Sequence, residues 1–279
     1  MKYCKKIVFH LLILTAMLCF ITSLLDKVQQ TAKITCLFKE EDTKELLRRQ
    51  QISGEIYETM KKYEKESDFS RYDYLSAYLL TEQTGKKDLD AYLELMYQYH
   101  SQNIRSMEKV EHALWGDLDY FPIPLPCLEN GMGTSFENSW MFERNFGGNR
   151  GHEGTDVMAS VNERGRYPVV SMTDGVVEKI GWLKLGGYRI GIRSEHGVYF
   201  YYAHLNDYAR DFTEGEEIKA GELLGFMGDS GYGPEGTTGQ FAVHLHVGIY
   251  VDDETGSEIS INPYWVLKWL EQKRLYYHF

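Results

Sequence analysis

The chain has 279 residues, of which 43% are hydrophobic and 25% are charged. This is the balance of an ordinary globular protein, with enough length for more than one folded unit. Its 30 basic and 41 acidic side chains give a formal net charge of −11 and a pI near 5.3, which argues against a nucleic-acid partner because nucleic acid is held by a basic surface.

The N-terminal residues 1–25 carry the pattern of a membrane segment. Lys2, Lys5 and Lys6 precede an uncharged run over residues 7–25, about the length that a helix needs to cross a bilayer. The basic flank predicts a cytoplasmic N-terminus, with the rest of the chain outside the cytoplasm. A cleavable signal peptide is the alternative and would give a secreted protein. No clear small-x-small cleavage site follows the run, so we favour an uncleaved single-pass anchor in the cell membrane.

Residues 26–38 are expected to form a juxtamembrane linker, and residues 39–116 a helical region. Apolar residues in the helical region recur at spacings of three and four, and no proline interrupts them, which predicts a bundle of three or four helices. One of these is expected to begin near Ser70, and another to cover residues 88–107. The sequence predicts either a spacer and packing partner or a module that regulates the following domain or binds a partner.

Three prolines, Pro122, Pro124 and Pro126, mark residues 117–127 as a linker. Residues 128–279 are expected to form a separate domain, because short apolar runs there alternate with glycine-containing turns in the pattern of an antiparallel β architecture. The expected fold class is therefore α+β: a membrane helix, a small helical region and a mainly antiparallel β domain.

Two hairpins are predicted within this domain. One joins residues 169–172 to 176–180, and the other joins residues 188–193 to 198–204. In the last of these strands His204 alternates with Phe200 and Tyr202, which predicts that it shares their face and overhangs a cleft at the strand end.

The cysteines do not form a zinc motif, because none of the four lies in a Cys-x-x-Cys spacing. Cys4 and Cys19 lie in or beside the membrane segment. Cys36 and Cys127 would lie outside the cytoplasm, and the sequence leaves open whether they pair.

Two further histidine motifs lie before and after the two predicted hairpins. His152 and Asp156 are four residues apart, which places them on one side of a strand or helical turn. His244 and His246 alternate with apolar residues, so a strand would point both imidazoles into one space.

This set of side chains suits a catalytic zinc ion, which takes three protein ligands and keeps one position open. His152, Asp156 and one histidine of the His244–His246 pair would supply the ligands. Because neighbouring positions on one strand do not both reach a metal easily, the second histidine would be free for proton transfer.

The order His-x-x-x-Asp, Tyr-x-x-His and His-x-His, over about residues 140–265, resembles the lysostaphin-type (LytM-like) zinc metalloendopeptidases, which cut peptidoglycan cross-links. The resemblance implies a β catalytic domain of that type. Carried over by position, the family's zinc ligands are His152, Asp156 and His246, and its two catalytic histidines are His204 and His244.

The resemblance implies hydrolysis of stem or cross-link peptides of peptidoglycan by metal-activated water. His244 would act as the general base, and His204 would hydrogen-bond the developing oxyanion. The bond that is cut is not fixed, and the loop over residues 228–239 is longer than the compact loop common in the family, which puts substrate preference in doubt. Arg144 and Arg150 could meet a substrate carboxylate, although a solvated arginine is the simpler interpretation of each.

The alternative function is envelope assembly. Some relatives of this family have lost zinc ligands and act as docking or recruitment proteins, and the helical region would then bind an envelope protein. All five expected side chains are present here, which favours the enzyme. A lipoyl- or biotinyl-type carrier is the weakest alternative, because the turn at Thr173-Asp174-Gly175 has no matching carrier lysine.

Overall fold

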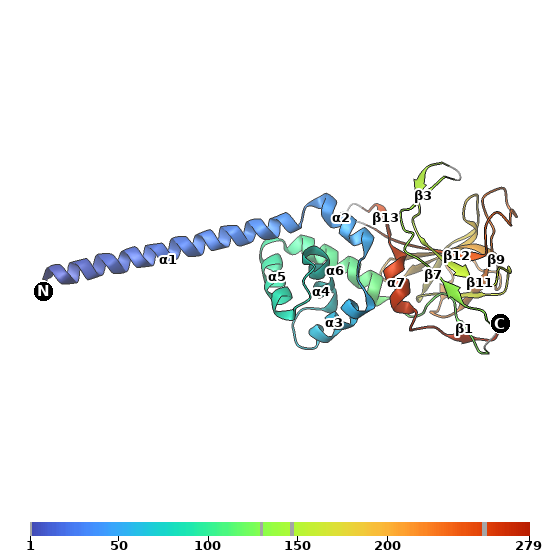
Figure 1. Cartoon of the computed structure of the whole chain (residues 1–279), viewed down its shortest axis with the longest axis horizontal. Helices are drawn as coiled ribbons and strands as arrows, with labels where there is room; N and C mark the ends of the chain where they lie inside the picture. Colours follow the sequence, from blue (N-terminus) through green and yellow to red (C-terminus); the bar gives the residue numbers. More distant parts are fainter. Residues whose placement is uncertain (1, 129–130, 146–147, 253–255) are drawn as a thin grey trace.

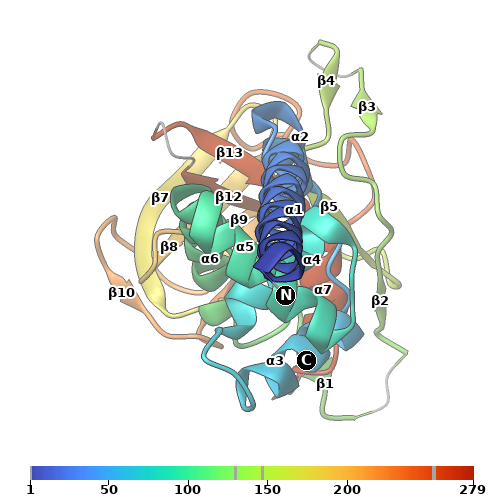
Figure 2. The ribbon, with the colours of Figure 1, turned by 90° about the vertical axis from the view of Figure 1, so that its left-hand side faces the viewer.

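The computed structural model describes residues 2–128, 131–145, 148–252 and 256–279. A long N-terminal helix leads into a bundle of short helices, and this bundle packs against one side of a β-domain (Figure 1). Seen along the N-terminal helix, the bundle lies in front of the strands, and the hairpin β3–β4 projects beyond its edge (Figure 2). The predicted α+β class, with an apolar N-terminal helix, a helical region and a mainly antiparallel β-domain, is confirmed.

Helix α1 (Lys2–Leu37) has 36 residues and is about 54 Å long at 1.5 Å per residue. It contains a window apolar enough to cross a membrane, and none of that window is buried against the rest of the protein. Such a helix near the N-terminus fits a membrane anchor or a signal sequence. Its last turns pack on the bundle, since Ile34 is fully buried and Lys33 Nζ lies 4.8 Å from the ring centroid of Tyr92.

The bundle divides into more helices than the three or four predicted. They are α2 (Glu40–Arg49), α3 (Gly54–Glu64), α4 (Arg71–Thr81), α5 (Lys86–Tyr99) and α6 (Ser101–Gly116). The predicted start near Ser70 is confirmed, because Ser70 and Asp73 form a reciprocal capping box. The predicted helix over residues 88–107 is wrong: it breaks at His100, whose ring stacks on Phe38 and bonds to Thr35 Oγ1 at 2.9 Å.

Residues 117–127, predicted as a linker, pack into the protein. Leu118, Phe121 and Ile123 are buried. Strand β1 (Leu125–Pro126) pairs in parallel with β14 (Tyr276–Tyr277) near the C-terminus. Close by, Tyr57 of α3 stacks on Trp115 of α6, and both rings contact Trp269 of α7 (Pro263–Leu270) at an angle, so the bundle and the β-domain share one apolar core.

The β-domain is built on one large antiparallel sheet with the order β10-β7-β8-β9-β12-β5-β2, in which β11 pairs with β6 and β9, and β13 pairs with β12. The separate hairpin β3–β4 (Glu143–Arg144 and Arg150–Gly151) stands beside it. The sheet strands are β2 (Thr134–Ser135), β5 (Thr155–Ala159), β6 (Pro168–Val170), β7 (Gly175–Leu183), β8 (Gly187–Ser194), β9 (Tyr199–Tyr208), β10 (Glu217–Ile218), β11 (Leu223–Met227), β12 (His244–Asp252) and β13 (Glu258–Ile261).

One of the two predicted hairpins is confirmed and one is wrong. Strands β8 and β9 pair directly, as predicted from the turn between them. Strand β6, in contrast, pairs with β11 and not with β7. The chain does not reverse at residues 173–175 because Ser171 exchanges backbone hydrogen bonds with Gly221 and Glu222.

Candidate metal centre

Strands β5 and β12 bring the predicted metal ligands together. Asp156 on β5 and His246 on β12 are direct partners across the antiparallel pair. His152 precedes β5, and its own backbone is held by hydrogen bonds to Met141 and Phe142. His152 Nε2, Asp156 Oδ1 and His246 Nδ1 each lie 3.0 Å from the other two.

The size of this triangle fits a zinc ion. Zinc bonds of about 2.0–2.1 Å in tetrahedral geometry place ligand atoms about 3.3 Å apart. The three donor atoms, from two imidazoles and one carboxylate, are close to that spacing and all face one point. Asp156, His152 and His246 can therefore hold a metal ion with an open position on the cavity side.

The three side chains share further polar neighbours. His152 Nδ1 lies 3.2 Å from the carbonyl oxygen of Ser139 and 3.1 Å from Arg144 Nη2, while its Nε2 faces Asp156 Oδ1. Burial acts to raise the pKa of Asp156, but hydrogen bonds from His152 and His246 outweigh it, and this carboxyl stays below its usual pKa. Arg144 Nη2 donates to the other carboxylate oxygen, Oδ2, at 2.7 Å.

His244 and His204 lie beside this triangle with matching orientations. His244 Nδ1 donates to the carbonyl of Ala242 at 2.8 Å, and His204 Nδ1 donates to the carbonyl of Ser230 at 2.7 Å. In the neutral form of each ring, Nε2 is therefore the nitrogen that carries no proton. The two ring centroids are 4.8 Å apart, and His244 Nε2 is 3.7 Å from Asp156 Oδ1.

His204 reaches the cleft through a break in strand register. Between the pairs Ile190–Tyr202 and Tyr188–Leu205, strand β9 has one more residue than β8. This β-bulge is accommodated at His204, whose φ is 62°, in the left-handed region. The prediction that His204 shares a face with Tyr202 is wrong: Tyr202 is buried in the core, and the bulge turns His204 toward the other side of the sheet.

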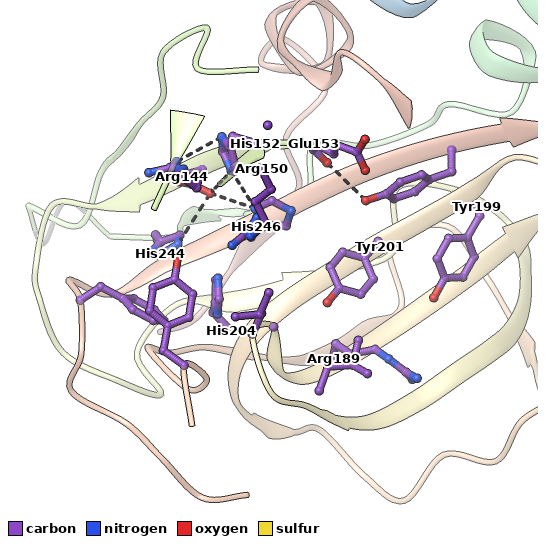
Figure 3. A pocket seen from close by; sticks show the side chains of 18 of the residues that line it. Arg144, Arg150, His152, Glu153, Arg189, Tyr199, Tyr201, His204, His244 and His246 are labelled. Carbon is purple, nitrogen blue, oxygen red and sulfur yellow. Dashed lines mark hydrogen bonds and ion pairs between the residues drawn. The ribbon is translucent and has the colours of Figure 1, made fainter. Parts of the chain in front are cut away.

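All five predicted side chains line one cavity of about 690 Å³ (Figure 3). Its floor is a row of tyrosines that begins next to the metal site. The ring centroid of Tyr201 lies 5.9 Å from that of His246. The centroids of Tyr201 and Tyr199 are 6.4 Å apart, and those of Tyr199 and Tyr250 are 6.1 Å apart.

The sequence drew attention to Tyr201 only through the Tyr-x-x-His motif, and Tyr199, Tyr250 and Arg189, which also line the cavity, were not predicted as site residues. A signal was available in β12, where the period of two that links His244 and His246 continues to Tyr250. Strand β9 offered less, because Tyr199 and Tyr201 share a face with each other but, before the bulge is known, not with His204.

Burial lowers the pKa of His204 well below its ordinary value, and the neighbouring charges of His244 and His246 act in the same direction. His204 is therefore a neutral imidazole at neutral pH. In that state, with its proton on Nδ1, it can accept a proton at Nε2 but cannot donate one from there.

Comparison with known proteins agrees with this site. The family model described as peptidase family M23 matches residues 150–261, which contain all five side chains. The L-Ala–D-Glu endopeptidase of Bacillus subtilis is 43% identical over 148 residues, and glycyl-glycine endopeptidase ALE-1 of Staphylococcus capitis is 33% identical over 102. These alignments cover 53% and 36% of this chain, and the chain spans only 43% and 24% of the length of those relatives.

A crystal structure of a proposed glycyl-glycine endopeptidase, LytM, from Ruminococcus gnavus is similar over more of the chain. The TM-score is 0.72 and the sequence identity 45%, over 88% of this chain and 98% of that one. A match of that extent reaches beyond the β-domain, so the helical bundle is also part of the shared structure.

Proposed function

The chain belongs to peptidase family M23, and on that basis we propose that it is a zinc-dependent endopeptidase that cuts stem or cross-link peptides of bacterial peptidoglycan. The observation that carries this proposal is the convergence of His152, Asp156 and His246 on one point, with the bare Nε2 atoms of His204 and His244 beside it. The same convergence favours the enzyme over a docking protein, for which such an arrangement would have no use.

His152, Asp156 and His246 would hold the metal. A bound zinc ion would lower the pKa of a water molecule toward neutrality and polarise the substrate carbonyl. The chain's own contribution is to fix the ligands. Backbone hydrogen bonds with Met141 and Phe142 hold the segment at His152, and cross-strand pairing sets the distance between Asp156 and His246.

His244 is placed to act as the general base. Its Nδ1–H is committed to the Ala242 carbonyl, so its Nε2 accepts a proton from the attacking water and returns it to the leaving amine. His204 was expected to donate a hydrogen bond to the oxyanion. With its Nδ1–H on the Ser230 carbonyl and its pKa lowered by burial, neutral His204 would instead accept a hydrogen bond from the attacking water at Nε2 and orient it.

The tyrosine floor and the loop over residues 228–239 would form the walls of a groove for an extended peptide. Tyr232 within that loop and Phe241 just after it line the cavity near His204. If α1 is retained as an anchor, the peptidase domain would lie outside the cytoplasm, where peptidoglycan is found. A partner protein for the helical bundle remains a prediction.

The experiment is digestion of purified peptidoglycan by the detergent-solubilised full chain, with mass spectrometry of the released peptides. The His246→Ala variant is expected to release none. His196→Ala is the matched control, because His196 lies in the turn between β8 and β9 and not among the residues lining the cavity, and it should release as much as wild type. Equal release by the His246→Ala variant would overturn the proposal.

A further inference from the structure

More arginine side chains line the cleft of this acidic protein than are paired there with carboxylates. Arg144, Arg150 and Arg189 all line the cavity, although the chain as a whole carries a net charge of −11. Arg144 is paired with Asp156 at 2.7 Å. Arg150 and Arg189 have no carboxylate within ion-pair distance in the described part of the chain.

These two arginines also carry unpaired polar atoms. Arg150 Nε and Arg189 Nη1 are each buried, and neither finds a hydrogen-bond partner among the described residues. A buried guanidinium N–H without an acceptor is costly, and such groups are normally paired. Both side chains are half-buried and line the cavity, so a ligand there meets positive charge that no carboxylate of the described residues neutralises.

The remaining acids of the cavity do not neutralise them. Glu258 is paired with Arg193, 3.1 Å away on the neighbouring part of the sheet. Glu153 is exposed and lies with Tyr250, whose hydroxyl donates to the Glu153 carbonyl at 3.3 Å. In Figure 3, Glu153 and Arg189 stand on opposite sides of the row formed by Tyr201 and Tyr199.

Both arginines act on the same part of the floor. Gly191 of β8 pairs with Tyr201 of β9, and Arg189 lies two residues along β8 from Gly191, on the same face of the sheet. Arg150 lines the same cavity as Arg189 and Tyr201. Tyr201 is the floor residue next to His246, with 5.9 Å between the ring centroids. An extended peptide advances about 3.4 Å per residue, so this point is within about two residues of the bond held at the metal.

We propose that Arg189, assisted by Arg150, forms a subsite for a free carboxylate of the substrate, within about two residues of the cleaved bond. This inference rests on the proposed function and narrows it. A guanidinium recognises a carboxylate through charge and paired N–H donors. The ligand is therefore an acidic stem peptide and not an uncharged glycyl bridge.

The chemistry of the stem peptide fits this position. Where D-glutamate is linked through its γ-carboxyl group, its α-carboxylate remains free on the residue that follows the L-Ala–D-Glu bond. Amidation of that carboxylate removes the charge and leaves the rest of the peptide unchanged. An oligoglycine bridge has no such group. Substrates with the two classes of bond named for the relatives, L-Ala–D-Glu and glycyl-glycine, thus differ in one negative charge. Arg189 would distinguish them by binding that charge.

The test compares kcat/KM of the full chain for three peptides: L-Ala–γ-D-Glu–L-Lys, its α-amide, and pentaglycine. We expect wild type to prefer the acid peptide over the amide by about 10- to 100-fold, since a site built for a polar group rejects analogues that lack it. Arg189→Gln should bring this ratio close to one by slowing only the acid peptide. Arg189→Lys, which keeps the charge but loses the fork, should give an intermediate ratio.

Arg166→Gln is the matched control, because Arg166 is exposed, pairs with Glu163 and is not among the residues lining the cavity. It should keep the wild-type ratio. If the Arg189→Gln protein does not fold, the Arg189→Lys and Arg150→Gln ratios decide. An acid-to-amide ratio that stays at the wild-type value in folded Arg189 variants would overturn the inference, as would wild-type preference for pentaglycine.

Binding separates this inference from the proposed function. Calorimetry with the His244→Ala variant should show tighter binding of the acid peptide than of the amide, and Arg189→Gln in that background should abolish the difference. If wild type cleaves no peptide and releases nothing from peptidoglycan, the proposed function is wrong. If the acid peptide and its amide bind equally, only the proposed carboxylate subsite is wrong.

Discussion

Among single residues, Arg144 has the most ambiguous position, because its guanidinium donates to the carboxylate that we assign as a metal ligand. A fixed positive charge beside a metal site opposes the binding of a dication. We expect Arg144→Gln to bind zinc about 3- to 10-fold more tightly, as measured by competition with a coloured chelator. Weaker binding in this variant would show instead that Arg144 orients Asp156 and is needed for the site.

The tyrosine floor depends on small residues beneath it. A Cβ atom on Gly191 would lie 1.9 Å from the Tyr199 hydroxyl oxygen, so that ring rests where a side chain would be. Gly191→Ala is expected to displace Tyr199 and to raise KM for stem peptides several-fold, while costing about 1–3 kcal/mol of stability. Gly133→Ala, whose added Cβ would have 3.9 Å of clearance, is the matched control and should change neither quantity. An unchanged KM in Gly191→Ala would show that this part of the floor does not contact substrate.

The pattern of apolar and polar residues along a strand predicted some of the site residues correctly and others not. The alternation of His244 and His246 with apolar residues correctly predicted that both face one space, because a strand has a fixed period of two. That period could not place His204, since one extra residue in β9 reverses the side on which it lies. Arg189 could not be predicted for a different reason. What marks it as a candidate binding residue is the lack of an ion-pair partner among the described residues, and only the folded structure shows this.

At the scale of elements, the bundle supports the loop that carries His152. Arg48 of α2 lies over the Trp140 ring, with 5.1 Å to the centroid, and its Nη2 contacts Met141 Sδ at 3.7 Å. Met141 in turn donates its backbone N–H to the His152 carbonyl at 2.8 Å. A chain of contacts therefore runs from the helical region to a proposed metal ligand.

This arrangement predicts that Arg48→Ala weakens zinc binding by roughly 2- to 10-fold, less than the roughly 10- to 100-fold seen when a group that contacts a metal ligand directly is removed, because Arg48 acts through Met141. The neighbouring Arg49 is exposed and pairs only with Glu45 in the described contacts, so Arg49→Ala is the control. Chelator competition on both proteins gives the answer. Equal zinc affinity would mean that the His152 loop holds its shape without the bundle.

Element boundaries were less predictable than element types. The helix start at Ser70 depends on local chemistry and was predicted from sequence, whereas the break at His100 depends on contacts with Phe38 and Thr35 from a distant segment. The failed hairpin at β6–β7 has the same cause. Its turn residues are ordinary, but Ser171 donates its backbone N–H to Glu222 and accepts one from Gly221, and these bonds direct the chain toward β11.

For the whole molecule, the structure bears on the expectation that the helical region regulates the enzyme. The described residues that line the cavity all come from the segment 144–258, so the bundle does not cover the cleft in this structure. It joins α1 to the β-domain through a shared core instead. Cys36 and Cys127, whose pairing was left open, are both free thiols here.

A buried carboxyl lies near the contact between the bundle and the β-domain. Glu111 is fully buried and accepts a hydrogen bond from Gln50 at 2.7 Å, and burial raises its pKa to about 8. Unfolding lets this group ionise at its ordinary pKa near 4.5. Between these two values the unfolded chain binds fewer protons, so stability falls as pH rises, by up to about 1.4 kcal/mol per pH unit, and levels off above pH 8.

Glu111→Gln should remove that part of the pH dependence, because an amide of the same shape does not ionise. Thermal unfolding of wild type and variant from pH 5 to pH 9 measures it, and we expect the variant to gain most at the alkaline end. Glu108→Gln is a comparison from the same helix, with a carboxyl that is only partly buried and a smaller expected effect. Parallel curves for wild type and Glu111→Gln would contradict a protonated Glu111 in the folded protein.

The most direct test of the central claim is a zinc titration of the metal-free full chain, with bound zinc and peptide release from peptidoglycan measured in the same samples. The account predicts that release rises in proportion to occupancy and reaches its maximum at about one zinc per chain, the capacity of the single site formed by His152, Asp156 and His246. Full release from the metal-free protein, or zinc bound at one per chain without any release, would contradict it.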